Sequence, residues 1–268
     1  MTEQLDLDRR ILSLNQIEHV SQFSDIEVEH FVRMFHHHCL SSAESVFEAI
    51  VDAPSLTPDD LRIAELTELH FSHISESVNS TGNDCPEAVD RSPSLQHGMA
   101  RPIEFNVIAS IFSDSMRADK TGRRPYPSGG ALYSVEPVLI CGDLITGAPP
   151  YSVLHYLPNT NKFEVIKGEF EENSYSKISS TPGVSFYIAY FMNIRKAIFK
   201  YRSRGYRLAL LETGSMYQLV SAAAQQKGIA SRVVSGFSDY QLTKTCGIDS
   251  RLMLPIIIQA LGVETGKC

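Results

Sequence analysis

Apolar side chains near the start of the chain recur with the spacing of a helix. Between residues 25 and 40 they follow the i, i+3, i+4, i+7 pattern of an amphipathic helix, at Val28, Phe31, Val32 and Phe35. Shorter helical patterns follow at 41–51 and from Ser55, where Pro58 suits a first helical turn. A stretch rich in Ser, Asn, Asp, Gly and Pro at 78–93 then breaks the pattern. We therefore expect a mostly helical N-terminal extension, residues 1–85, and a second domain, residues 86–268.

The second domain mixes helical and strand-like patterns. In chain order they predict a helix at 103–116, a strand within 131–142, a hairpin at 151–166, a buried strand at 183–193, a long helix at 206–227 and a final strand at 255–261. Gly228 is a natural stop for the long helix. The order lacks the regular strand–helix–strand alternation of a Rossmann chain, and we find no internal repeat.

Composition places the chain among ordinary globular proteins. It has 268 residues, 43% of them hydrophobic and 21% charged, and a formal net charge of −7. That negative charge argues against non-specific nucleic-acid binding, and no apolar run approaches the roughly 18 residues of a membrane span. The polar, acidic start is unlike a secretory signal, and five scattered cysteines without a CxxC pair favour reduced thiols. We expect a cytoplasmic protein.

Several common site motifs are absent. The sequence contains no GxGxxG, no P-loop, no GxSxG elbow and no HExxH. The histidine run 36–38 cannot converge on one metal ion, because consecutive helical residues point about 100° apart, so we interpret it as a partly solvated helix face. His70 and His73 have helical spacing but no further visible ligand, and we expect no metal site. No histidine follows His155, so acid–base chemistry in the second half must use other side chains.

The stretch RRPYPSGGALYSVE, residues 123–136, contains a loop that a ligand can approach closely. Its small residues leave the main chain accessible, at Pro127, Ser128, Gly129 and Gly130. The amides of such a loop can face a planar cofactor or an anion. The alternative is an ordinary turn between a helix and a strand.

The stretch FKYRSRGYRLALLETGSMYQ, residues 199–218, places Lys200 beside Tyr201 among three arginines. Nearby cations favour a phenolate and lower the pKa of a tyrosine, so a Lys–Tyr pair can act as a base where histidine is absent. The alternative is a solvated lysine beside a half-buried tyrosine. We expect Arg204 and Arg207 to orient the site or to pair with carboxylates such as Glu212.

These two blocks, with VSGFSDYQLTKTCGID at 234–249 and PIIIQALG at 255–262, carry a family resemblance. Over about residues 90–268 the sequence resembles the nitroreductase-like flavoproteins. Within them it is most similar to the azoline dehydrogenases that mature thiazole- and oxazole-containing peptides of the microcin type. The resemblance implies an α+β fold with a central, mainly antiparallel sheet flanked by helices. It also implies a homodimer that binds FMN at the subunit interface.

The resemblance also assigns roles to residues. It implies that Pro127, Ser128, Gly129 and Gly130 contact the flavin ring, that Ser235 and Gly236 lie close to the flavin, and that Lys200 and Tyr201 form the base. Ser94 and Gln96 stand where the family phosphate motif has its serine and second arginine. That arginine is missing here. The candidates to supply its charge are Arg91, Arg101, Arg123 and Arg124.

The implied activity is oxidation of peptide thiazolines or oxazolines to thiazoles or oxazoles. Tyr201, assisted by Lys200, would take a ring proton while FMN accepts a hydride, and dioxygen would reoxidise the flavin. The implied partners are a heterocyclised precursor peptide, a cyclodehydratase and a leader-peptide-binding subunit, with the N-terminal extension as a docking surface. Two alternatives remain open: an NAD(P)H-dependent nitro or quinone reductase, and a flavin-free scaffold subunit of a peptide-modifying complex.

Overall fold

The computed structural model describes residues 25–37, 57, 93–99 and 101–264. The helices expected at 41–51 and from Ser55, the His70–His73 pair, Arg91 and the domain boundary at 85/86 lie outside the described residues. Cys141 and Cys246 are buried and unpaired, and the other cysteines also lie outside.

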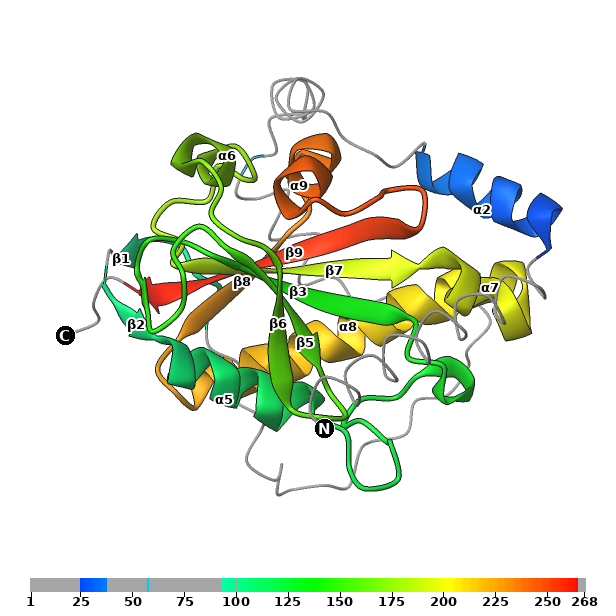
Figure 1. Cartoon of the computed structure of the whole chain (residues 1–268), viewed down its shortest axis with the longest axis horizontal. Helices are drawn as coiled ribbons and strands as arrows, with labels where there is room; N and C mark the ends of the chain where they lie inside the picture. Colours follow the sequence, from blue (N-terminus) through cyan, green and yellow to red (C-terminus); the bar gives the residue numbers. More distant parts are fainter. Residues whose placement is uncertain (1–24, 38–56, 58–92, 100, 265–268) are drawn as a thin grey trace, which may run out of the picture.

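A seven-stranded sheet forms the centre of the molecule (Figure 1). Its order is β1-β9-β7-β3-β5-β6, with β8 paired to β9. The strands are β1 (Gly98–Met99), β3 (Val135–Cys141), β5 (Val153–Leu157), β6 (Lys162–Lys167), β7 (Phe186–Asn193), β8 (Ala230–Val234) and β9 (Met253–Glu264). Every pairing in this sheet is antiparallel, which confirms the expected sheet type. A small parallel pair joins β2 (Ile103–Glu104) and β4 (Ile145–Thr146).

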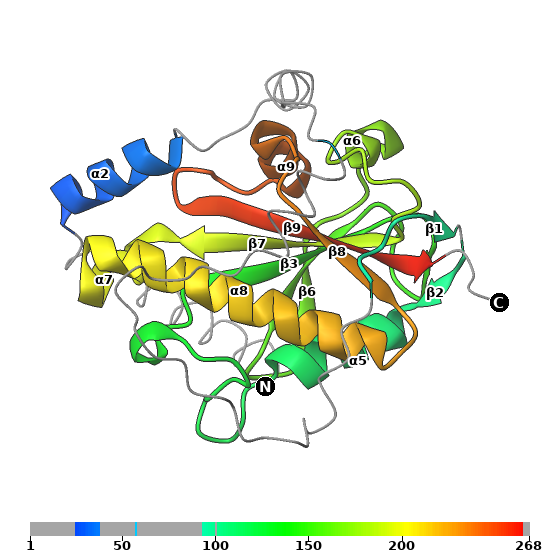
Figure 2. The same ribbon diagram turned by 180° about the vertical axis from the view of Figure 1, so that it is seen from behind.

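Strand β7 is buried on both faces, because successive side chains point to opposite sides of a sheet. Ile188 and Tyr190 belong to a core cluster that includes α5 (Phe105–Met116) and α8 (Ser203–Gln225). Tyr187 and Ala189 face a second cluster that includes α9 (Asp239–Cys246), near α6 (Glu172–Ser176). Figure 2 shows α8 lying along one face of the sheet. The sheet is therefore the middle layer between two helical layers.

Most of the predicted elements exist, with shifted ends. The helix at 103–116 begins at Phe105 after β2, and the hairpin at 151–166 is β5 and β6. The predicted buried strand is β7, and the long helix is α8, which begins earlier than expected, at Ser203. The apolar pattern does not predict α7 (Ile194–Tyr201), α9 or β8.

Helix α2 (Ile26–His37) confirms the helical pattern near the start of the chain. Of its four apolar positions, Val32 is buried and Val28 packs against the core as predicted, but Phe31 and Phe35 are not buried. Phe31 and Phe35 are 64% and 54% exposed. The face that meets the body also includes Glu29, Arg33 and His36.

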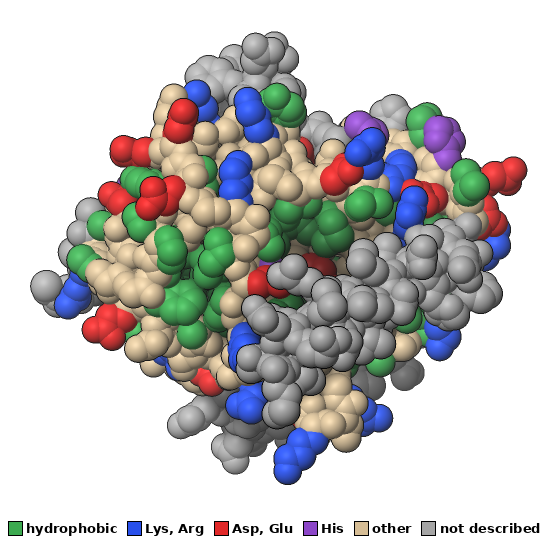
Figure 3. Space-filling view, viewed as in Figure 1, with side chains coloured by type: hydrophobic (Ala, Val, Ile, Leu, Met, Phe, Trp, Pro, Cys, Tyr) green, Lys and Arg blue, Asp and Glu red, His purple; other side chains and the backbone are tan. Residues whose placement is uncertain are grey.

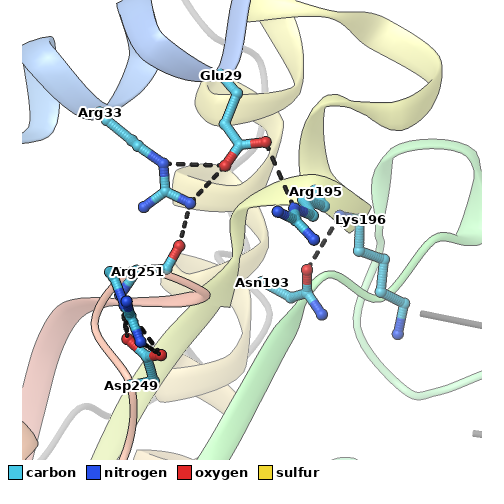
Figure 4. A network of polar contacts seen from close by, with 7 residues as sticks. All are labelled: Glu29, Arg33, Asn193, Arg195, Lys196, Asp249 and Arg251. Atoms are coloured by element: carbon cyan, nitrogen blue, oxygen red, sulfur yellow. Dashed lines mark hydrogen bonds and ion pairs between the residues drawn. The ribbon is translucent and has the colours of Figure 1, made fainter. Parts of the chain in front are cut away.

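Ionic contacts with the body hold this face of α2 (Figure 4). Glu29 pairs with Arg33 at 2.6 Å and with Arg195 of α7 at 3.4 Å, and Arg33 also donates to the carbonyl of Arg251. His36 is only 5% exposed, so the expected solvated histidine face is wrong for this residue, whereas His37 is exposed. Polar contacts of Glu29 and Arg33 with the body therefore accompany the apolar contacts of α2.

A cavity of about 600 Å³ lies between α5 and the β5–β6 hairpin. Its lining includes Phe105, Leu154 and Phe163, and Figure 3 shows apolar side chains gathered on this face of the molecule. None of the predicted site residues lines it.

Among the described helices, none is both long enough and apolar enough to cross a membrane. Within the described ranges no group of His, Cys, Asp and Glu could hold a metal ion.

Candidate active site

The glycine loop, residues 127–130, leads into a short 3₁₀ turn, Gly129–Ala131, just before β3. Gly130 has φ 63°, a value that favours glycine, because a side chain there meets its own backbone. Gly129 packs against α8, since a Cβ on it would lie 2.8 Å from a methyl group of Leu208. The loop is therefore seated on α8, with Gly130 at its exposed tip.

Lys200 and Tyr201 form the last turn of α7, directly before the corner that leads into α8. Asn193 begins α7 by accepting a hydrogen bond from the amide of Lys196 at 3.1 Å. Arg202 turns the chain with φ 50° and ψ −138°. A Cβ on Gly205 would lie 1.9 Å from the carbonyl oxygen of Ala197, so only glycine lets the two helices meet this closely.

The structure brings the glycine loop and the Lys–Tyr pair together. A Cβ on Gly130 would lie 2.7 Å from the Tyr201 hydroxyl and 3.3 Å from the Lys200 Nζ. The Lys200 Nζ lies 5.4 Å from the centre of the Tyr201 ring, within the range of a cation–π contact. A primary ammonium, a phenol and exposed main chain therefore share one small region of the surface.

Glu212 of α8 holds the loop from below. The Ser128 hydroxyl donates to its Oε2 at 2.6 Å, and the Val135 amide donates to its Oε1 at 3.2 Å. Burial raises the pKa of Glu212, and the hydrogen bond from Ser128 opposes that rise. The expected pairing of Glu212 with Arg204 or Arg207 is wrong: both arginines are exposed, and the carboxylate points into the molecule toward the loop.

A second, partly buried cation lies beside the loop. The Arg124 guanidinium stacks 4.5 Å from the centre of the Tyr133 ring and donates to the Tyr126 hydroxyl at 2.8 Å. Arg123 and Arg124, two candidates for the missing phosphate arginine, line one cavity of about 600 Å³ together with Arg117 and Lys120. These four cations outnumber the one carboxylate in the lining, Asp119.

Lys196 lies one helical turn before Lys200 but has its own counterion. Its Nζ lies 3.4 Å from Glu136, which also lies 3.4 Å from His155. Burial works against ionisation of Glu136, yet the hydrogen bond with His155 and the charge of Lys196 lower its pKa to about 2. Glu136 is therefore ionised at neutral pH and compensates Lys196.

Ser94 and Gln96 lie at the opposite end of the sheet. Leu95, which lies between them, donates its amide hydrogen to the carbonyl of Ser231 in β8. Through the pairings of β8 with β9, β9 with β7 and β7 with β3, Ser231 is in register with Cys141, at the end of β3 far from the loop. Val135, next to the glycine loop, is then about 20 Å away along the strand direction. The structure therefore does not bring Ser94 and Gln96 to the glycine loop within one chain.

Ser235 and Gly236 follow the end of β8. Val234 pairs with Ile258 and is level with Val138 in β3, three strand spacings or about 14 Å away. Ser235 and Gly236 therefore lie on the side of the sheet end that carries the glycine loop, but β9 and β7 separate them from β3. Of the predicted flavin contacts, the structure thus joins only the loop to Lys200 and Tyr201.

The local chemistry of the loop and the dyad fits a flavin. Gly130 is exposed and lacks a side chain, so a flat ring can approach its main chain from the solvent side, next to Tyr201 and Lys200. The Lys200 ammonium supplies positive charge next to this surface, where a reduced flavin ring would carry negative charge. The cationic cavity at Arg117, Lys120, Arg123 and Arg124 is also compatible with an anionic group.

The comparison with protein families agrees with this fold. The Nitroreductase family model matches residues 99–263, so the chain belongs to the nitroreductase family. The chain is 32% identical to the Microcin B17-processing protein McbC of Escherichia coli, over 98% of this chain and 99% of that protein.

Solved structures show the same similarity. A chain of the E. coli microcin synthetase McbBCD complex with truncated pro-MccB17 bound matches with a TM-score of 0.82 at 30% identity, covering 93% of this chain and 98% of that one. A structure from Ralstonia eutropha assigned to the nitroreductases matches with a TM-score of 0.54 at 13% identity, over 68% of this chain and 87% of that chain. The second match shows the fold alone.

Proposed function

We propose that this protein is an FMN-dependent dehydrogenase that oxidises peptide thiazolines or oxazolines to thiazoles or oxazoles. The observation that carries the proposal is the approach of Lys200 and Tyr201 to Gly130. It sets a potential base beside main chain that can accept a planar cofactor. The similarity to McbC over nearly the whole chain supports a microcin-type peptide as the substrate.

The roles of the two side chains follow from their chemistry. Oxidation of an azoline to an azole removes one proton and one hydride from the ring. As the base, the Tyr201 oxygen takes the ring-carbon proton, and Lys200, whose Nζ lies 5.4 Å from the centre of the Tyr201 ring, is the assisting cation. FMN, if bound there, would supply the two-electron acceptor for the hydride, and dioxygen would take the electrons from the reduced flavin.

The glycine loop would hold the flavin ring. The remainder of the FMN molecule would be held by residues from elsewhere in the fold. Ser94 and Gln96 are about 20 Å from the loop along the strands, so within one chain they do not contact the same part of a ligand as Gly130. A homodimer would let one subunit supply the loop and its partner supply these residues, with Ser235 and Gly236 nearby.

The proposed partners follow from the same similarity. The E. coli complex contains a truncated precursor peptide together with the McbB, McbC and McbD chains. We infer that the present protein likewise acts on a heterocyclised precursor peptide, with a cyclodehydratase and a leader-peptide-binding subunit. A reduced, cytoplasmic location is part of this proposal.

The decisive experiment is mass spectrometry of a heterocyclised peptide before and after incubation with the protein and FMN. We expect a loss of two hydrogens per ring. Lys200→Ala and Tyr201→Phe should each lower the oxidation rate by about 10²-fold or more, because general-base catalysis contributes roughly 10²–10⁴-fold. Lys177→Ala, at an exposed lysine after α6, should keep the wild-type rate.

Other outcomes would point elsewhere. Full oxidation by both dyad variants would remove Lys200 and Tyr201 from the mechanism. Rapid NADPH oxidation with quinones or nitroaromatics, without change in the azoline peptide, would identify a nitro or quinone reductase. A colourless protein that does not bind added FMN would identify a flavin-free scaffold subunit.

A further inference from the structure

The segment that follows the glycine loop has an unusual backbone. Gly130 is followed by Ala131 at φ 56° and Tyr133 at φ 49°. Residues other than glycine rarely adopt these left-handed values, because the Cβ crowds the backbone. Such conformations persist only when surrounding contacts enforce them. Something in the fold must therefore hold residues 128–135 in this path.

Beside the contact of Tyr133 with Arg124, three hydrogen bonds in this segment form a network around one carboxylate. The Ser128 hydroxyl accepts a hydrogen bond from the Tyr133 amide at 2.8 Å and donates to Glu212 at 2.6 Å. The other oxygen of Glu212 accepts from the Val135 amide at 3.2 Å. Glu212 thus ties the residue before the strained turn to the residue after it.

The position of Glu212 suits this task. It is 2% exposed, and a buried carboxylate is costly unless hydrogen bonds compensate it. Leu208, one helical turn earlier on α8, contacts Gly129, so this face of α8 forms the floor of the loop. The proposed proton transfer needs only Lys200 and Tyr201, which leaves the burial of Glu212 unexplained by catalysis.

We propose that Glu212 is a positioning residue: through Ser128 it fixes the glycine loop in the conformation that accepts the flavin ring. This inference rests on the function proposed above for the loop. Glu212 touches neither Lys200 nor Tyr201 in this arrangement, so it acts on binding and on loop geometry, not on proton removal.

The first test uses the flavin-free protein and so does not depend on activity. Glu212→Gln removes the charge and one acceptor while keeping the size of the side chain. We expect the amides of Tyr133 and Val135 to exchange hydrogen at least about tenfold faster, since a lost buried hydrogen bond changes such equilibria by about this factor. Thr213→Val, an isosteric change at the next buried position, should leave both rates unchanged.

The second test measures the FMN dissociation constant by quenching of FMN fluorescence. Glu212→Gln and Ser128→Ala should each raise it about tenfold, whereas Ser128→Thr, which keeps the hydroxyl, should restore binding. The double variant should bind no worse than Glu212→Gln alone, because the two residues act as one unit. If Glu212→Gln does not fold, Ser128→Ala still carries the test.

The results separate the two proposals. Wild-type exchange rates at Tyr133 and Val135 in Glu212→Gln, or additive losses of FMN affinity in the double variant, would overturn the role of Glu212. A wild-type protein that does not bind FMN would instead overturn the proposed function, and the exchange experiment would still decide whether Glu212 holds the loop.

Discussion

Gly130 is the residue at which the loop and the proposed base meet. Two separate features of the structure require glycine at this position. Its φ of 63° is strained for any other residue, and a Cβ would also lie 2.7 Å from the Tyr201 hydroxyl. Gly122 shows the first cause without the second, because it has φ 84° but nothing within 4 Å of its Cβ position.

We therefore predict that Gly130→Ala lowers azoline oxidation at least about tenfold, because displacement of a catalytic group by a fraction of an ångström is costly. Gly122→Ala is the matched control. Both should lose roughly 1 kcal/mol of unfolding free energy from the left-handed backbone, measured by urea denaturation. Equal activity of the two variants would show that Tyr201 does not need its position beside the loop.

At this scale, the sequence alone identified residues that are neighbours in the chain. Lys200 and Tyr201 are adjacent, and 127–130 form one short block. Glu212 escaped assignment because its partner Ser128 is 84 positions away, and no local pattern shows such a contact. The expected partners of Glu212 were the nearest arginines in sequence, and the fold turns those toward solvent.

At the scale of elements, the sequence predicted strands and helices with a long apolar pattern, but it did not predict the short helices. Strand β7 and helix α8 were predicted because long apolar patterns dominate them. Helix α7 has only eight residues, and its charged side chains hid the corner before α8. For α2 the period was right, and Val28 and Val32 face the body as predicted. Phe31 and Phe35 do not, because Glu29 and Arg33 contact residues of the body that are distant in sequence.

The docking of α2 places a charge next to the proposed base. Asp25 caps α2, since its Oδ1 accepts from the amides of Glu27 and Val28 at 3.0 and 3.2 Å. Its Oδ2 pairs with Arg202 at 2.5 Å, the residue directly after Tyr201. One carboxylate thus links the start of α2 to the α7–α8 corner.

We predict that Asp25→Asn keeps the cap but loosens this corner, because asparagine caps well and carries no charge. Amides of residues 200–205 should exchange about two- to fivefold faster, since an exposed ion pair contributes at most about 1 kcal/mol. Oxidation should slow by a similar factor without a change in KM. Glu27→Gln makes the same charge change on an exposed neighbour, and an equal effect there would rule out the Asp25–Arg202 pair as the cause.

At the scale of the whole molecule, the pattern predicted strands but not their order. Strand β3 lies between β5 and β7, and β9 joins β7 to the edge strands β1 and β8. This order separates Ser94 and Gln96 from the glycine loop by the length of the sheet. No linear motif can state whether two segments serve one ligand in the same chain or across a dimer, because that depends on assembly.

The stability of the whole fold should depend on pH through His36, which joins α2 to the body. Its Nδ1 lies 3.2 Å from the Tyr206 hydroxyl. Burial, and then the charge of His37, lowers the pKa of His36 to about 4. Because the pKa is lower in the folded state, the unfolded chain binds the proton first as pH falls below about 6.5. Stability is therefore full above that pH and declines toward pH 4.

We predict that acidification from pH 6.5 to pH 5 lowers the unfolding free energy by about 1.5 kcal/mol more in the wild type than in His36→Gln. Burial lowers the pKa of His155, but the Glu136 and Glu164 carboxylates raise it by more. Protonation of His155 therefore stabilises the folded state as pH falls, which opposes the effect of His36. The effect of His36 is isolated by comparing the wild type with His36→Gln. Urea titrations followed by circular dichroism at both pH values give the four free energies. His30→Gln, exposed on the same helix, should behave like the wild type. Parallel pH curves for wild type and His36→Gln would show that His36 does not link the docking of α2 to protonation.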